Sequence, residues 1–198
     1  MTFTVLTVCT GNICRSPYAE VDLQRRLAGL DVRVVSAGTG ALIGEPVPEP
    51  GLRLAAEAGI DLSGHRGRQI AEQDVRDADL ILALTREHRK AIVAVSPAAL
   101  RRTFTLLEFA RIAEYFRNDA SVLSGTHATD SDRLAHLVAF AARVRGTIPP
   151  PDNPGDLDIT DPFLQSDAVY RESYGTISGA VGPIAEFLIP DPTRSGRE

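Results

Sequence analysis

The order of the elements at the start of the chain constrains the fold most strongly. The apolar and β-branched run at residues 3–8 predicts a buried strand that Gly11 ends. Ser16 and Pro17 then predict the start of a helix, with Ser16 as the N-cap and Pro17 at the first helical position. A second strand is predicted at residues 32–37. Strand, loop, helix and strand in this order imply a parallel pair of strands joined by a crossover helix.

The same alternation continues along the chain and predicts one α/β domain. Further strands are predicted at residues 79–84 and 103–106, and helices at 52–58, 87–95, 108–116, 134–141 and 167–188, the last one kinked or interrupted at Pro183. With 198 residues, 43% of them hydrophobic, the chain is long enough for one core. We predict a four-stranded parallel sheet with helices on both faces. This domain is expected to span residues 1–189, with an insertion at about 117–157, before a flexible tail at 190–198.

Composition excludes several classes of protein. A net charge of −5 at pH 7 argues against general nucleic-acid binding, which needs a basic surface. The two cysteines, Cys9 and Cys14, lie close together near the start, unlike the dispersed cysteines of a secreted disulfide scaffold. The first residues lack the pattern of a signal peptide, and no apolar run approaches the roughly 18 residues that span a bilayer. We therefore expect a cytoplasmic protein without a membrane span.

Residues 9–17, read as Cys-Thr-Gly-Asn-Ile-Cys-Arg-Ser-Pro, lie between the first predicted strand and the first predicted helix. Open α/β sheets bind ligands at this place, outside the carboxyl ends of their strands. Backbone N–H groups of the loop, with the helix N-terminus behind them, would form an anion cradle that favours a thiolate at Cys9. Arg15 adds a planar fork for two phosphate oxygens, and Asn12 can adopt the left-handed conformation. The predicted phosphate-binding loop also includes Thr10, Gly11, Ile13, Cys14 and Ser16.

A single cysteine at the end of a buried strand is usually only a small hydrophobic residue. A cysteine followed after five residues by Arg-Ser, at a strand-to-helix turn, is far rarer. This spacing favours a catalytic loop in which Cys9 is the nucleophile and the hydroxyl of Ser16 assists its thiolate. Because the loop supplies a nucleophile and an anion site without metal ligands, we expect no metal and no cofactor.

The loop and several later segments together resemble the low-molecular-weight protein-tyrosine phosphatases. The matching segments are residues 8–20, Ser-Ala-Gly-Thr at 36–39, Gly-Ile-Asp-Leu at 59–62, His-Arg at 65–66, Arg-Gln-Ile at 68–70, Asp-Leu-Ile-Leu at 79–82 and Asp-Pro-Phe at 161–163. The resemblance covers about residues 3–110 and 158–188. Many members have an aromatic residue near positions 40–44, and an aspartate where this chain has Thr85. The aliphatic Leu42 and the threonine are similar to the bacterial branch of the family.

The resemblance implies a role for individual residues. Cys9 would form a phosphocysteine intermediate, Arg15 would bind the phosphoryl oxygens, and Asp161 would act as general acid and then as general base. The residues that would support the loop are Asn12, Ser36 and His65. The implied substrate is a phosphotyrosine protein, and the bacterial branch implies a bacterial tyrosine kinase as a partner.

Some of these residues have simpler explanations. His65 could be an ordinary surface histidine, and Ser36 an ordinary residue at a strand end. Pro162 and Phe163 favour Asp161 as the acid, because the proline restricts the backbone and the aromatic ring lies beside it. The competing carboxylates are Asp152, Asp156 and Asp158. The insertion at about 117–157 could be a lid, a docking surface or only a tolerated surface segment.

Three other functions are alternatives. Arsenate reduction on the same fold would relay oxidation through later cysteines, and none follows Cys14. A cysteine hydrolase of carbon substrates, with His65 as its base, would not need Arg15 in the loop. A non-catalytic phospho-binding module would not require Cys9, Arg15 and a distal Asp-Pro together.

A second hypothesis is that Cys14 takes part in reversible oxidation of Cys9. A solvent-reachable thiolate at Cys9 would be the most oxidisable group in the chain. If curling of the loop brings the two sulfurs into range, Cys14 could resolve a sulfenic acid on Cys9 by forming a disulfide. The alternative is that Cys14 is a packing residue beneath the loop.

Overall fold

One parallel sheet forms the centre of the protein. The computed structural model describes residues 2–119, 122 and 127–189. Its strands are β1 (Phe3–Cys9), β2 (Val32–Gly38), β3 (Leu80–Ala83) and β4 (Thr103–Thr105), in the spatial order β2-β1-β3-β4. All three ladders are parallel, which confirms the predicted four-stranded sheet. β2 lies on one side of β1 and β3 on the other, so the direction of the chain across the sheet reverses at β1. In open α/β sheets such a reversal leaves a crevice at the carboxyl end of the strand.

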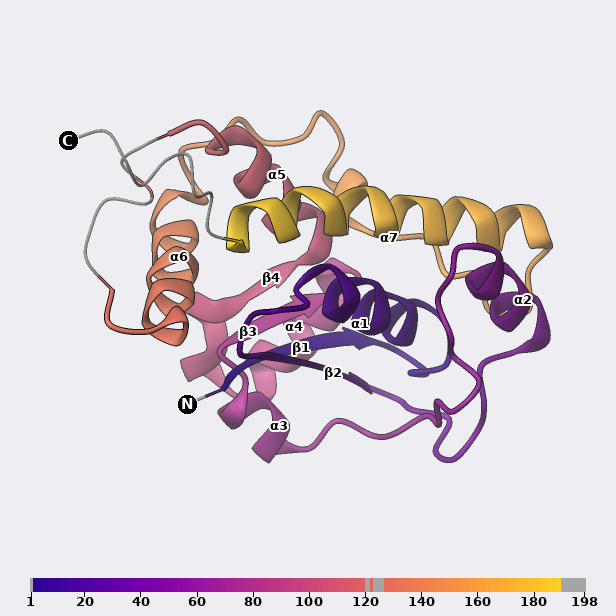
Figure 1. Ribbon diagram of the computed structural model, residues 1–198. Helices are drawn as coiled ribbons and strands as arrows, with labels where there is room; N and C mark the ends of the chain where they lie inside the picture. Colours follow the sequence, from indigo (N-terminus) through magenta and orange to yellow (C-terminus); the bar gives the residue numbers. More distant parts are fainter. Residues whose placement is uncertain (1, 120–121, 123–126, 190–198) are drawn as a thin grey trace.

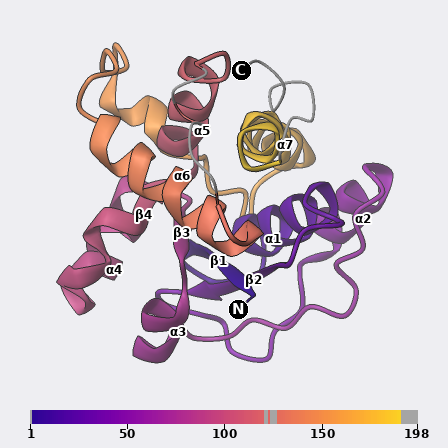
Figure 2. The same ribbon diagram turned by 60° about the vertical axis from the view of Figure 1, so that its left-hand side comes forward.

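Helices cover both faces of the sheet, as predicted (Figure 1, Figure 2). One face packs against α1 (Arg15–Arg26), α5 (Leu106–Tyr115) and α7 (Asp167–Leu188), and α2 (Glu49–Glu57) joins this layer. The other face packs against α3 (Glu72–Asp77), α4 (Arg86–Val95) and the 3-10 helix η1 (Pro97–Arg102). Alternate strand residues enter the two cores: Val5 and Leu82 lie in the first, and Leu6 and Ile81 lie in the second. Burial on both faces explains why the strands are continuously apolar in the sequence.

Several helix boundaries differ from the prediction. Ser16 is not the N-cap of α1, because the chain becomes helical already at Arg15 and Cys14 takes the cap position. α5 begins at Leu106 rather than at residue 108, since the hydroxyl of Thr105 accepts a hydrogen bond from the N–H of Glu108 and caps the helix. α7 has the predicted bounds and passes through Pro183 without interruption. The short elements α3 and η1 have no counterpart in the prediction.

The predicted insertion contributes a helix that packs against the domain. α6 (Asp130–Val144) buries Leu134, Leu137, Val138 and Ala141 in the first core and packs against α5 and η1. Because η1 directly precedes β4, α6 lies beside the amino-terminal ends of the strands, away from the loop that follows β1 (Figure 1). This position is incompatible with α6 being a lid over that loop. The 3-10 helix η3 (Pro154–Leu157) then leads to the segment around Asp161.

Two sequence predictions fall partly outside this description. The predicted tail at 190–198 lies outside the described residues, and so do positions 120–121 and 123–126 of the insertion. The division of the chain into residues 1–189 and a tail therefore stays a prediction. Among the described helices, none is both long and apolar enough to cross a membrane.

Candidate active site

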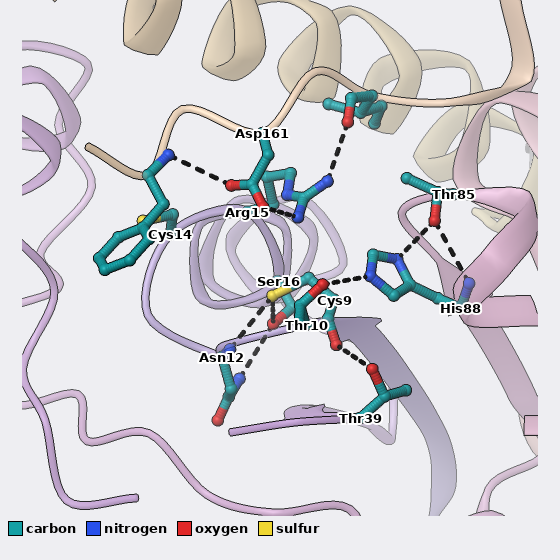
Figure 3. Close-up of polar contacts among 12 residues, drawn as sticks. Cys9, Thr10, Asn12, Cys14, Arg15, Ser16, Thr39, Thr85, His88 and Asp161 are labelled. Atoms are coloured by element: carbon teal, nitrogen blue, oxygen red, sulfur yellow. Dashed lines mark hydrogen bonds and ion pairs between the residues drawn. The ribbon is translucent and has the colours of Figure 1, made fainter. Parts of the chain in front are cut away.

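A pocket of about 170 Å³ opens where β1 ends and α1 begins. Its lining includes Cys9, Thr10, Arg15, Leu42, Asp161 and Phe163. Cys9 is the last residue of β1, Thr10 lies in the loop that follows, and Arg15 is the first residue of α1. Asp161 and Phe163 come from the segment before α7. The structure therefore brings the predicted nucleophile, the predicted anion-binding arginine and the predicted acid to one cavity, at the edge of the sheet where the topology predicts a ligand site (Figure 3).

Hydrogen-bond donors surround the sulfur of Cys9. The thiol is free and only 2% of Cys9 is exposed. The backbone N–H of Asn12 donates to Sγ at 3.3 Å, and the hydroxyl oxygen of Ser16 lies 3.0 Å from it. Because the Ser16 oxygen already accepts from Asn12 Nδ2 at 2.9 Å, its hydrogen is available to the sulfur. Two hydrogen-bond donors are thus aimed at the sulfur of Cys9.

Asn12 organises the loop from within. It is fully buried and has φ 54°, in the left-handed region that asparagine tolerates better than most residues. Its Nδ2 also donates to Ser36 Oγ at 2.8 Å, and its Oδ1 accepts from the backbone N–H of Arg68 at 2.9 Å. Its carbonyl oxygen lies 2.7 Å from His65 Nε2, which must be the donor because a carbonyl can only accept. Ser36 and His65 thus contact the loop, and Arg68 is a further contact that the sequence did not suggest.

Arg15 and Asp161 form an ion pair at the pocket. The guanidinium is 4% exposed; it donates from Nη1 to the carbonyl oxygen of Ile159 at 3.0 Å and pairs through Nη2 with Asp161. Its Nε has no partner among the described residues. Asp161 also accepts from the N–H of Phe163 at 3.2 Å, and its carboxylate stays 48% exposed. The Arg15 guanidinium is therefore held at the pocket by an ion pair with Asp161 and by the carbonyl oxygen of Ile159.

The competing carboxylate Asp158 is engaged elsewhere. Its oxygens accept from the backbone N–H, the Nε and the Nη2 of Arg86 at 2.6, 3.0 and 2.7 Å. Burial alone would raise the pKa of Asp158, but the hydrogen bonds and charge of Arg86 outweigh it and lower that pKa. Of the four carboxylates that the sequence offered, Asp161 is the one that lines the pocket.

His88 lies on the other flank of the loop, and no sequence pattern singled it out. His88 is 6% exposed and sits in the first turn of α4, where Thr85 is the N-cap. Its Nε2 lies 2.8 Å from Thr10 Oγ1, and its Nδ1 lies 2.9 Å from Thr85 Oγ1. A threonine followed three residues later by a polar residue is a capping signal, but it does not reveal that His88 reaches the loop.

Cys14 points away from solvent and toward α7. Its Sγ lies 3.4 Å from the hydroxyl of Tyr170, although it also borders the pocket that contains Cys9. Burial raises the pKa of the Cys14 thiol to about 12, and the hydrogen bond from Tyr170 opposes this only in part. Cys14 is therefore a neutral thiol near pH 7.

A buried cysteine and a buried arginine at a strand-to-helix turn, with an aspartate paired to the arginine in the same pocket, form a phosphatase-like site on a doubly wound α/β fold. Residues 4–123 match the family model of the low molecular weight phosphotyrosine protein phosphatases. The chain belongs to this family, as the resemblance of its loop implied.

Curated relatives and solved structures agree with this assignment. The chain is 42% identical to the phosphatase Etp of Escherichia coli over 99 residues, which is 50% of this chain and 66% of Etp. It is 41% identical to the probable phosphatase EpsP of Ralstonia nicotianae over 116 residues, 58% of this chain and 79% of EpsP. The structure of the tyrosine phosphatase Wzb from Escherichia coli K30 with sulphate superposes with a TM-score of 0.67 at 26% identity, covering 96% of this chain and all of Wzb. The YwlE arginine phosphatase from Geobacillus stearothermophilus superposes with a TM-score of 0.64 at 29% identity, covering 93% and 91%.

Proposed function

We propose that this protein is a metal-independent phosphomonoester hydrolase that acts on protein phosphotyrosine. The observation that carries the proposal is the convergence of Cys9, Arg15 and Asp161 on one pocket, with two hydrogen-bond donors at the sulfur of Cys9. The family match supports phosphatase chemistry, and the names of Etp and Wzb support the tyrosine ester.

In the first step, the Cys9 thiolate attacks phosphorus and the bond to the leaving oxygen breaks. Arg15 holds the phosphoryl oxygens with the free Nε and with the Nη2 that Asp161 vacates, which is the bidentate geometry that guanidinium offers. Asp161, in the carboxylic acid form that the second step regenerates, donates its proton to the leaving phenolate. The products are tyrosine and a phosphocysteine at Cys9.

In the second step, the Asp161 carboxylate takes a proton from water, which attacks the phosphocysteine and releases phosphate. The sulfur leaves as a thiolate and regains the hydrogen bonds from Asn12 N–H and Ser16. These two donors stabilise the nucleophile before the first step and the leaving group in the second. Asn12 in turn is held by Ser36 and His65, which we propose as the support of the loop.

The walls of the pocket suit an aromatic ester. Ile13, Leu42 and Phe163 present apolar surface around the polar floor formed by the loop. A phenyl ring would pack between them while its phosphate reaches Cys9. A phosphoprotein of the bacterial cytoplasm is the substrate class we propose, and a bacterial tyrosine kinase the candidate partner.

Phosphoarginine is the second candidate substrate, because a structural neighbour is an arginine phosphatase. The two functions are separated by measuring kcat/KM of the purified chain on phosphotyrosine, phosphoserine and phosphoarginine peptides, with and without a chelator. We expect phosphotyrosine to be preferred and the chelator to have no effect. A preference for phosphoarginine would make phosphoarginine the substrate instead of phosphotyrosine. Activity that the chelator removes would contradict the metal-independent mechanism.

Oxidation of Cys9 by peroxide is expected to be reversible through Cys14. Peroxide converts the Cys9 thiolate to a sulfenic acid, and the Cys14 thiol would then form a disulfide with release of water. Wild type should regain activity with dithiothreitol, whereas Cys14→Ser should recover poorly, and bound phosphate should protect both. The measurement is phosphatase activity after matched peroxide exposure and reduction. Equal recovery of the two proteins would leave Cys14 as a packing residue that contacts Tyr170.

A further inference from the structure

A row of three side chains supports the phosphate loop from the side opposite to Asn12. His88 in α4 joins the other two through its ring nitrogens: Nδ1 lies 2.9 Å from the hydroxyl of Thr85, the N-cap of α4, and Nε2 lies 2.8 Å from the hydroxyl of Thr10 in the loop (Figure 3). The mechanism described above uses none of these contacts. Thr10, however, lines the pocket that contains Cys9. The direction of the two hydrogen bonds therefore decides whether the Thr10 hydroxyl is a donor or an acceptor toward the pocket.

The imidazole of His88 carries one proton at neutral pH. Burial first, and then the charge of Arg15, lower the pKa of His88 to about 4, although the carboxylates of Asp161 and Asp158 oppose the shift. One ring nitrogen is therefore a donor and the other an acceptor. The position of that single proton follows from the neighbours of Nδ1.

The contacts of Thr85 favour one position for that proton. Its hydroxyl oxygen accepts the backbone N–H of His88 at 3.3 Å, as an N-cap does, and Nδ1, at 2.9 Å, is the acceptor within reach of the hydroxyl hydrogen of Thr85. With Nδ1 accepting, the ring proton sits on Nε2 and is donated to Thr10 Oγ1. The Thr10 oxygen then acts as an acceptor, so its hydroxyl hydrogen has no acceptor among the described residues. This hydrogen belongs to a residue on the wall of the pocket.

We propose that the Thr10 hydroxyl donates a hydrogen bond to a phosphoryl oxygen in the pocket, and that His88 is the positioning residue that keeps it a donor. The proposal rests on the proposed function, since it assumes that a phosphoryl group occupies the pocket. Thr10 would add a side-chain donor to the backbone cradle and to Arg15. His88 acts only through Thr10.

Two pairs of substitutions test the proposal. Thr10→Val removes the hydroxyl at constant shape, and a lost hydrogen bond to a charged oxygen should weaken inorganic phosphate binding and kcat/KM by ~10–100-fold. Thr10→Ser keeps the hydroxyl and should stay close to wild type. His88→Leu should lose nearly as much phosphate affinity and kcat/KM as Thr10→Val. His88→Gln keeps a donor at the position of Nε2 and should therefore retain most of both. The Thr10→Val, His88→Leu double variant should lose no more than Thr10→Val alone.

The position of the ring proton of His88 can be measured directly. It distinguishes a His88 that orients the Thr10 hydroxyl from a His88 that only packs beside the loop. Long-range ¹H–¹⁵N spectra of wild type near pH 7 should show His88 protonated on Nε2. His136→Gln, on α6 at the far end of the sheet, is the matched control and should leave the spectrum of His88, phosphate affinity and kcat/KM unchanged.

The outcomes separate this inference from the proposed function. A His88 proton on Nδ1, or Thr10→Val binding phosphate as wild type does, overturns the role of Thr10 even if phosphotyrosine is hydrolysed. Wild type that binds phosphate but hydrolyses no ester overturns the function while the Thr10 contact stands. Wild type that does not bind phosphate overturns both.

Discussion

Replacing Cys9 with serine is expected to abolish turnover of aryl phosphates while the fold and the anion site persist. Serine has nearly the same shape, but its hydroxyl does not ionise near neutral pH, and the two donors at this position stabilise an anion that it cannot form. The hydrogen bonds of Asn12 to Ser36 and to Arg68 do not involve the sulfur and should survive. Single-turnover and steady-state kinetics on para-nitrophenyl phosphate measure the loss.

Thermal unfolding and phosphate binding of Cys9→Ser control for damage to the loop. Both should stay close to wild type, because Arg15 and the loop N–H groups hold the anion. Wild type should in addition accumulate a phosphocysteine that acid quenching traps, and Cys9→Ser should not. Appreciable turnover by Cys9→Ser would exclude Cys9 as the nucleophile.

Replacing Asp161 with asparagine is expected to slow hydrolysis of esters with poor leaving groups by about 10²–10⁴-fold, the usual contribution of a positioned acid or base. The loss in the first step should shrink for very good leaving groups, which need little protonation. Inorganic phosphate should inhibit the variant more strongly than wild type, since Arg15 loses the carboxylate that competes with phosphate for Nη2. A series of aryl phosphates of graded leaving-group pKa measures both effects.

Asp158→Asn is the matched control for that experiment. Asp158 accepts three hydrogen bonds from Arg86 and does not line the pocket, so its loss should affect stability more than chemistry. Its effect on rate should not depend on the leaving group. A leaving-group dependence in Asp158→Asn, and none in Asp161→Asn, would move the role of the acid to Asp158.

The sequence alone was sufficient for the features that depend on local spacing. Apolar runs bounded by turns and amphipathic repeats located all four strands and most helices, because burial of alternate faces demands such patterns. The segment from Cys9 to Arg15 is short enough for one loop to bring the nucleophile and the arginine together. Its place between a strand and a helix predicted an anion site before any tertiary contact was known.

Tertiary structure decided everything that joins distant segments. Asp161 pairs with Arg15, 146 residues away in the chain, whereas Asp158 is held by Arg86 and does not line the pocket. His88 reaches Thr10 because β3 pairs beside β1 and places the start of α4 against the loop. α6 lies at the end of the sheet away from the pocket, although its sequence was compatible with a lid. Such contacts depend on strand order and packing, which local periodicity does not encode.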